Sequence, residues 1–201
     1  MTQLTSRERM IDAAEELIAE DGIAAMTLRQ VHTKAGQSNR VAAQYHFGSK
    51  TGLVEAVVER RMPRINEERR AMLERTSNPP TLRALVEALV LPFAQETIYR
   101  ENSYWARFLV QCMNDPRLAD MIYKHFHADS ARDVINLIVE YCDLPERTAR
   151  NRAMNLAHLT AVAIARMEVP DNEIDDLSDR IADLIDSGVG LLEAPASARR
   201  Q

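Results

Sequence analysis

Apolar side chains recur three or four positions apart along most of the chain, which is the spacing of one face of an α-helix. In the first such run, Thr5 and Glu8 form a capping box before the apolar residues, and Gly22 follows them. The apolar face of this predicted helix consists of Met10, Ile11, Ala14, Leu17 and Ile18. Long β-branched runs are scarce and helix-favouring residues prevail, so the predicted fold class is all-α.

Two short helices are predicted next, one on each side of a glycine turn. Thr27 and Gln30 repeat the capping pattern and open a helix that ends at Gly36, and Ser38 can cap another that runs towards Tyr45. Together with the longer helix in front, they predict a tri-helical helix-turn-helix unit.

The remaining pattern predicts a larger helical body. Ser49 caps a long helix that connects the small unit to this body, and Pro63 is expected to kink or interrupt it. A further long helix is expected to end near Tyr141. We therefore predict a helix-turn-helix domain over residues 1–50, a ligand-binding and dimerisation domain over 51–194, and a disordered tail over 195–201.

Charge is distributed unevenly. The formal net charge is −5, yet the segment from Thr27 to Lys50 contains no Asp or Glu. Residues 1–50 hold six basic and six acidic side chains, and all six acids precede Gly22. A segment with positive charge only is typical of a surface that contacts nucleic-acid phosphates.

Side chains in this segment suit both kinds of DNA contact. Arg can bind guanine and Asn or Gln can bind adenine in the major groove, whereas hydroxyl, imidazole and ammonium groups suit phosphates. The alternatives are a solvated helix face, or, for Tyr45, Phe47 and His46, a structural role; for Phe47 we prefer the core. The candidate DNA-binding residues are Thr27, Arg29, Gln37, Ser38, Asn39, Arg40, Gln44, Tyr45, His46 and Lys50.

Other features exclude some classes of function. Cys112 and Cys142 lack metal-site spacing, and His125 and His127 point to different sides of a helix, so we expect reduced thiols, no metal and no cofactor. Neither a signal peptide nor an apolar run long enough to span a membrane is evident, which predicts a cytoplasmic protein. No catalytic motif is recognisable, so an enzyme is not expected.

The segments SRERMIDAAEELIAEDGIAAMTLRQVHTKAGQSN and YHFGSKTGLVEAV resemble the N-terminal domain of the tetracycline-repressor-type (TetR) family of transcriptional regulators. The resemblance covers roughly the first 55 to 60 residues. It implies an all-helical homodimer that binds an operator, dimerises through its last two helices and releases DNA when a ligand enters the body. The spacing AGQSNRVAAQYHF is one residue longer than is common in the family, which leaves open which side chains reach bases.

Candidate residues for the other two functions lie further along the chain. Aromatic residues concentrate between residues 93 and 126, where they form either core or the wall of a ligand pocket. The candidate ligand-binding residues are Phe93, Tyr104, Trp105, Phe108, Cys112, Tyr123 and His127. The last two predicted helices carry faces of small and apolar residues, from which we predict a dimer interface of Ala149, Ala153, Leu156, Thr160, Ala163, Met167, Leu177, Ile181, Leu184 and Gly188.

The sequence thus predicts a ligand-responsive repressor that binds a pseudo-palindromic operator as a homodimer. A small, hydrophobic or aromatic molecule of unknown identity is the expected effector. Two alternatives stay open: a DNA-binding regulator that responds to no ligand, and a helical enzyme that reuses the fold.

Overall fold

The structure is a computed structural model that describes residues 4–36, 46–100, 102–127, 130–168 and 174–196. Every regular element in these ranges is a helix, which confirms the all-α prediction. The helices are α1 (Ser6–Ala25), α2 (Leu28–Lys34), α4 (Lys50–Arg75), α5 (Leu82–Gln95), α6 (Trp105–Met113), α7 (Ala119–His127), α8 (Ser130–Tyr141), α9 (Glu146–Met167) and α10 (Ile174–Glu193). The predicted tail lies outside the described residues from residue 197 onwards.

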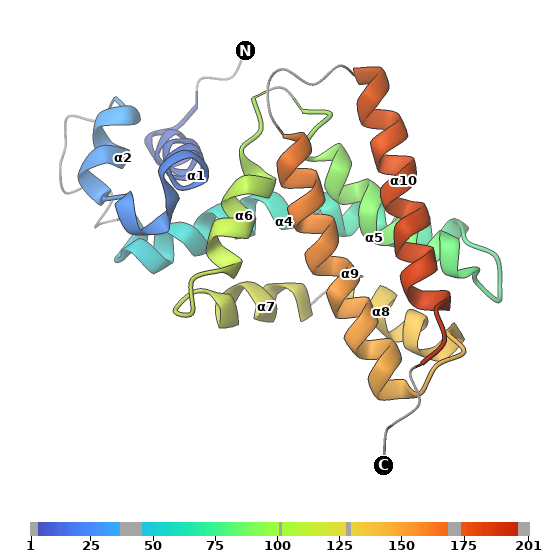
Figure 1. The fold of residues 1–201 in the computed structure, drawn as a ribbon. Helices are drawn as coiled ribbons and strands as arrows, with labels where there is room; N and C mark the ends of the chain where they lie inside the picture. Colours follow the sequence, from blue (N-terminus) through green and yellow to red (C-terminus); the bar gives the residue numbers. More distant parts are fainter. Residues whose placement is uncertain (1–3, 37–45, 101, 128–129, 169–173, 197–201) are drawn as a thin grey trace.

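Helices α1 and α2 lie together at one end of the molecule, and with residues 46–49 they form what we call the head (Figure 1). Both predicted capping boxes are present. The Thr5 hydroxyl accepts from the Glu8 amide at 3.2 Å, and the Thr27 hydroxyl accepts from the Gln30 amide at 3.2 Å. Gly22, with φ of 81°, interrupts the helical geometry near the end of α1, a conformation that glycine adopts without a steric penalty.

Helix α4 connects the head to the body, which we define as α5 to α10 (Figure 1). The Ser49 hydroxyl caps it by accepting from the Gly52 amide at 3.0 Å, as predicted. The helix continues through Pro63, so the predicted interruption is absent. Because Pro63 and Glu59 are both exposed, water can hydrogen-bond the carbonyl that the proline leaves without a donor.

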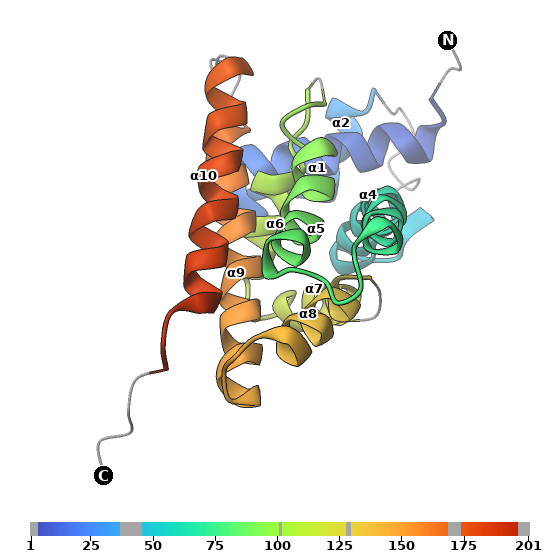
Figure 2. The same cartoon turned by 90° about the vertical axis from the view of Figure 1, so that its right-hand side faces the viewer.

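The body is layered. Figure 2 shows α10 and α9 on one side, α5 and α6 in the middle and α4 on the other side. Apolar side chains from all of these layers form one continuous core that includes the fully buried Trp105 and Phe108.

Where one long helix ending near Tyr141 was predicted, the described residues form two helices, α7 and α8, and residues 128–129 between them lie outside the described part. Helix α8 begins at Ser130, which is fully buried. Its hydroxyl donates to the Asn66 side chain at 2.8 Å and accepts from Arg69 at 3.1 Å, so α8 starts against α4.

Most side chains of the predicted dimer interface are buried within the single subunit, and the interface itself stays a prediction. Ala149, Ala153 and Leu156 are fully buried, and a Cβ added to Gly188 would lie 2.8 Å from Leu156 and 2.9 Å from Val86 of α5. The small residues of α9 and α10 therefore allow close packing within the subunit. The other members are also buried except Ala163, which is half-buried: Thr160, Met167, Leu177, Ile181 and Leu184.

Candidate nucleic-acid interface and its link to the helical body

The exposed part of the head carries some of the predicted DNA-binding residues. Thr27, Arg29 and His46 are exposed, and so is the neighbouring Gln30. Six predicted contacts lie outside the described residues, within residues 37–45: Gln37, Ser38, Asn39, Arg40, Gln44 and Tyr45. Their role in binding DNA stays a prediction.

Phe47 has the structural role that we preferred for it. The ring is partly buried against the core, and the guanidinium carbon of Arg7 lies 5.4 Å from its centroid. This cation–π contact joins the start of α1 to the segment before α4.

Lys50 makes contacts that the sequence did not suggest. Its ammonium donates to the carbonyl of Met26 at 2.7 Å and to the carbonyl of Ile23, both at the end of α1. Carbonyls at the end of a helix carry partial negative charge, which suits a cation. Burial lowers the pKa of Lys50, and the nearby Arg117 lowers it further. Lys50 therefore holds α4 against the head, a structural role beside the predicted phosphate contact.

A buried ion pair joins α1 to α4. Arg61 Nε donates to Glu15 Oε2 at 2.9 Å, its Nη2 donates to Glu15 Oε1, and both side chains are buried. Next to them, Arg60 Nη2 lies 2.6 Å from Asp12 Oδ1. A two-pronged guanidinium–carboxylate pair fixes orientation as well as distance. This pair was not predicted from the sequence, because charged residues on an amphipathic helix are usually exposed to solvent.

A second polar contact joins the head to the body. The Tyr104 hydroxyl, at the start of α6, donates to Glu16 of α1 at 3.0 Å, and Lys34 of α2 forms an ion pair with the same Glu16 oxygen at 2.9 Å. The hydrogen bond to Glu16, aided by burial, raises the pKa of Tyr104. Tyr104 is thus a contact between head and body, which differs from its predicted place in a ligand pocket.

The first turn of α6 is held by Glu168, which follows α9. Its carboxylate accepts from the backbone amides of Ala106 at 3.2 Å and Arg107 at 2.9 Å. Burial raises the pKa of Glu168, although these hydrogen bonds oppose the shift. A negative charge at this position complements the positive end of the α6 dipole.

Two small voids lie inside the body, each of about 20 Å³. The first, the α4 void, is lined by Met62, Ile65, Arg69, Phe93, Leu109, Thr160 and Ala161. The second, the α8 void, is lined by Met113, Tyr123, Ala131, Ile135, Met154 and His158. Leu89 and Ala157 line both, so the two voids adjoin.

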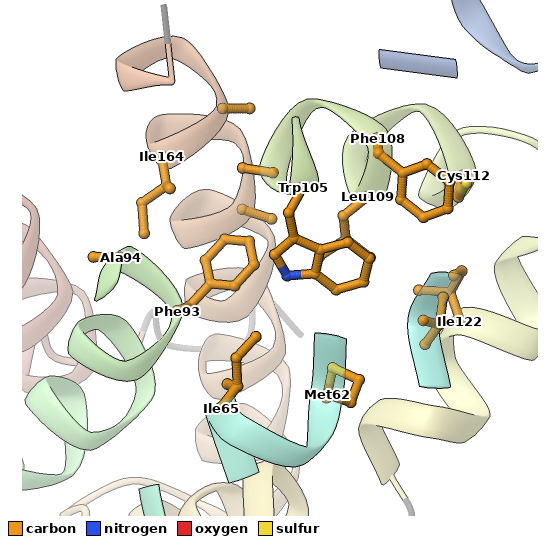
Figure 3. Close-up of a cluster of buried hydrophobic side chains, with 14 of the residues drawn as sticks. Met62, Ile65, Phe93, Ala94, Trp105, Phe108, Leu109, Cys112, Ile122 and Ile164 are labelled. Atoms are coloured by element: carbon orange, nitrogen blue, oxygen red, sulfur yellow. The ribbon is translucent and has the colours of Figure 1, made fainter. Parts of the chain in front are cut away.

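The predicted ligand-binding residues divide between these voids and the core. Phe93 lines the α4 void and Tyr123 lines the α8 void. Trp105 and Phe108 stack with ring centroids 5.5 Å apart, inside the cluster drawn in Figure 3. Cys112 is fully buried, and burial raises the pKa of its thiol to about 12. The side chain of His127 lies outside the described residues.

The surface of α9 carries two exposed apolar side chains, Leu159 and Val162, which are 42% and 47% exposed. An open groove beside them, between α9 and α10, is lined in part by Ala163, Met167 and Leu184. Ala163, Met167 and Leu184 belong to the dimer interface predicted from the sequence, whereas Leu159 and Val162 do not. Helical spacing shows which residues share a face and not what covers that face.

Neither metal chemistry nor a membrane helix is indicated by the residues that the structure describes. No group of three or more His, Cys, Asp or Glu side chains there could hold a metal ion. None of the helices searched is long and apolar enough to cross a membrane.

A short helix that ends in a glycine turn, lies beside a longer helix and is joined by α4 to a helical body is the arrangement expected for the first two helices of a helix-turn-helix domain. Residues 10–57 match the family "Bacterial regulatory proteins, tetR family". The chain is 29% identical over 162 residues to the HTH-type transcriptional regulator BetI of Escherichia coli, across 78% of this chain and 79% of the relative.

Two solved structures share the fold. A TetR-like transcriptional regulator from a Rhodococcus species has a TM-score of 0.64 at 17% identity and covers 94% of this chain and 98% of its own. The TetR family transcriptional regulator PfmR from Thermus thermophilus has a TM-score of 0.62 at 16% identity, with coverage of 98% and 100%. The match over residues 10–57, the similarity to BetI and the shared fold together support a DNA-binding transcriptional regulator of the TetR type.

Proposed function

We propose that this regulator is a homodimeric repressor that leaves its operator when a small molecule binds in the body. The single observation that carries the proposal is the position of the α4 void. Met62 and Ile65 of α4 line it, and α4 also holds the head through Arg61 and Lys50. A molecule that enlarges the void must move side chains of the same helix that positions the head.

The mechanism is a shift between two populations. In the state described above, Arg61 with Glu15 and Tyr104 with Glu16 join the head to α4 and α6. A ligand that binds a second arrangement of α4 more tightly would lower the population in which two heads fit one operator. The free energy that couples ligand binding to DNA release is set by the ratio of the ligand's affinities for the two states.

The proposed dimer uses the exposed side of α9 and its groove with α10. Leu159 and Val162 would be the central apolar contacts. Asp179, Asp183 and Arg180 border the same groove and would lie at the rim of the interface. Two heads related by a twofold axis would then meet two half-sites of an inverted repeat.

The proposed DNA contacts are Thr27, Arg29 and His46 together with side chains of residues 37–45. Arg29 is the candidate phosphate contact best placed for a test, because it is exposed on α2. We propose that the segment after Gly36 reads the bases, because it occupies the sequence position of the second helix of a helix-turn-helix unit.

The experiment is selection of binding sites from a random duplex library with the purified chain, followed by measurement of its mass in solution. An inverted repeat bound by a particle of twice 22.7 kDa is expected. A monomer, or enrichment of no inverted repeat, would overturn the proposal. If a repeat is bound and no compound changes its affinity across a broad screen, the regulator is ligand-independent and the repressor mechanism above is wrong.

A further inference from the structure

Two buried polar atoms lie in the part of the core that contains the α4 void; Thr160 lines the void, and Trp105 belongs to the surrounding core. The hydroxyl oxygen of Thr160, which lines the void, and the indole Nε1 of Trp105 have no hydrogen-bond partner among the described residues. Trp105 is 0% exposed and Thr160 is 3% exposed. In Figure 3 the indole nitrogen is on the side of the ring that faces Phe93, Ile65 and Met62, three residues of the void wall.

Both atoms favour the same kind of ligand group. An indole N–H only donates, and a threonine hydroxyl donates when an acceptor is offered. The void wall also contains Arg69, whose guanidinium donates to the Ala88 carbonyl at 3.0 Å and adds a positive charge to the wall. None of the residues lining either void is Asp or Glu. A hydrogen-bond acceptor fits this cavity, and a cation does not.

The α8 void adjoins the α4 void through Leu89 and Ala157, and the polar side chains in its wall are hydrogen-bonded. His158 Nδ1 lies 2.7 Å from the Met154 carbonyl and must donate to it, so His158 Nε2 accepts from the Tyr123 hydroxyl at 2.6 Å. What remains for a ligand is an apolar wall that includes Met113 and Met154. Methionine side chains change rotamer readily and adapt to a guest.

We propose that the ligand is an elongated apolar molecule ending in a carbonyl or carboxylate oxygen, with that oxygen held by Trp105 and Thr160 and its chain directed into the α8 void. This inference rests on the proposed function in assuming that the body binds a ligand at all. It adds the chemical class and the orientation.

The way in passes Met62. An open groove on the outer side of α4 is lined by Glu59, Met62, Pro63, Asn66, Glu67, Arg70 and His125, and Met62 lines both this groove and the α4 void. At about 20 Å³ each void has room for one water molecule, so an elongated guest must displace side chains. Met62 is the side chain that separates the void from the groove.

The binding experiment uses three probes of matched length: decanoate, 2-undecanone and decyltrimethylammonium. Trp105 is the only tryptophan in the chain, so one indole N–H resonance and one emission spectrum report on the proposed contact. Saturable binding of at least one carbonyl probe is expected, with a downfield shift of the indole proton as it gains an acceptor. Decyltrimethylammonium is expected to leave the resonance unchanged.

The matched variants are Thr160→Val and Thr97→Val. Both threonines are buried, but the Thr97 hydroxyl donates to the carbonyls of Phe93 at 2.7 Å and Ala94 at 3.0 Å. Thr160→Val should weaken binding of the carbonyl probe roughly two- to tenfold, the effect of one lost hydrogen bond. Thr97→Val, provided that it retains the wild-type helical spectrum, should leave the dissociation constant within about twofold, because its hydroxyl is already used.

Three results would overturn the inference: failure of both carbonyl probes to bind, tighter binding of the ammonium probe, or equal affinity in Thr160→Val and wild type. The operator test separates this inference from the proposed function. A carbonyl probe that binds at Trp105 without weakening operator binding contradicts ligand-induced release and leaves the ligand class standing. A cation that releases the operator supports release and contradicts the ligand class.

Discussion

Arg61 of α4 and Glu15 of α1 form a buried two-pronged ion pair, with Arg61 Nε 2.9 Å from Glu15 Oε2. The pair is the buried charged contact between the head and the helix that leads into the body. Its consequence is that the orientation of the head depends on α4, since neither charge can leave its partner without a desolvation penalty.

Arg61→Met should destabilise the protein by about 3 to 5 kcal/mol, because it leaves the Glu15 carboxylate buried with only the more distant Arg60 at 3.4 Å. The double variant Glu15→Leu with Arg61→Met should recover most of this loss, because no unpaired charge remains. Urea unfolding followed by circular dichroism measures both. As a control, Arg75→Ala, which removes an exposed pair with Glu68, should cost under about 1 kcal/mol. Equal losses at Arg61 and Arg75 would contradict the assignment.

Thr160→Val and Thr97→Val should differ in their effects on the stability of the ligand-free protein. Valine has nearly the same shape as threonine, so the change removes a hydroxyl. At Thr97 it removes hydrogen bonds to two carbonyls, and we expect a loss of about 1 kcal/mol in the free energy of unfolding. At Thr160, where the described chain offers no partner, stability should be unchanged or higher. Chemical denaturation of the two variants side by side tests this; a clear loss at Thr160 would show that its hydroxyl is already bonded.

Local features of the fold could be predicted from the sequence, and contacts between distant segments could not. The capping boxes of Thr5 and Thr27 and the Ser49 cap involve residues three positions apart, so their pattern is complete within one turn of helix. The start of α8 at Ser130 depends instead on Asn66 and Arg69 of α4, which no local pattern reveals.

The candidate site shows the same division. The acid-free segment indicated the DNA-binding head, and the match over residues 10–57 supports its TetR type. Lys50 was expected to hold phosphate, yet its ammonium contacts carbonyls of α1, because a lysine next to a basic segment looks the same in either role. Ala149 and Ala153 were expected at a dimer interface, yet they are buried in one subunit, because small residues allow close packing against any neighbour.

Asp115 should make stability sensitive to acid. Its carboxylate accepts from the Arg117 side chain at 3.0 and 2.7 Å and from the Arg117 amide at 2.9 Å, which lowers the pKa of Asp115 to about 2. A folded-state pKa below the unfolded value of about 3.9 contributes stability that is fully present above that value and is lost as the pH falls towards about 2. The difference in unfolding free energy between wild type and Asp115→Asn should therefore shrink between about pH 4 and pH 2.

The measurement for Asp115 is urea unfolding at a series of pH values. Asp120→Asn, at a carboxylate of α7 that is exposed, serves as the control and should show a much smaller dependence on pH. A gap between wild type and Asp115→Asn that stays constant down to pH 2 would exclude the depressed pKa.

Arg29→Ala and Lys50→Ala should differ in their effects on DNA binding. If Arg29 contacts a phosphate, its loss weakens binding to every duplex and reduces the slope of log K against log salt by about 0.9. Lys50→Ala should instead lower the free energy of unfolding by about 1 to 3 kcal/mol, because it removes hydrogen bonds from a charged donor to Met26 and Ile23. Fluorescence anisotropy across a salt series, with urea unfolding in parallel, separates the two effects. If Lys50→Ala instead reduced the salt slope by about 0.9 and left the free energy of unfolding unchanged, Lys50 would be a phosphate contact.

Val162→Asp should convert the proposed dimer into a monomer. Val162 is 47% exposed in one subunit and lies on the same side of α9 as Leu159, so a carboxylate there costs little in the monomer. In the dimer it would be buried against an apolar partner surface, and we expect the dissociation constant to rise on the order of 100-fold, equivalent to about 3 kcal/mol. Sedimentation equilibrium measures the change directly. Tyr99→Asp, at a side chain that is 48% exposed outside α9 and α10, is the matched control and should leave the dimer intact. If the Val162→Asp protein stays fully dimeric, the dimer interface lies elsewhere on the body. If it becomes monomeric and also loses cooperative binding to an inverted repeat, this face of α9 is required for operator recognition.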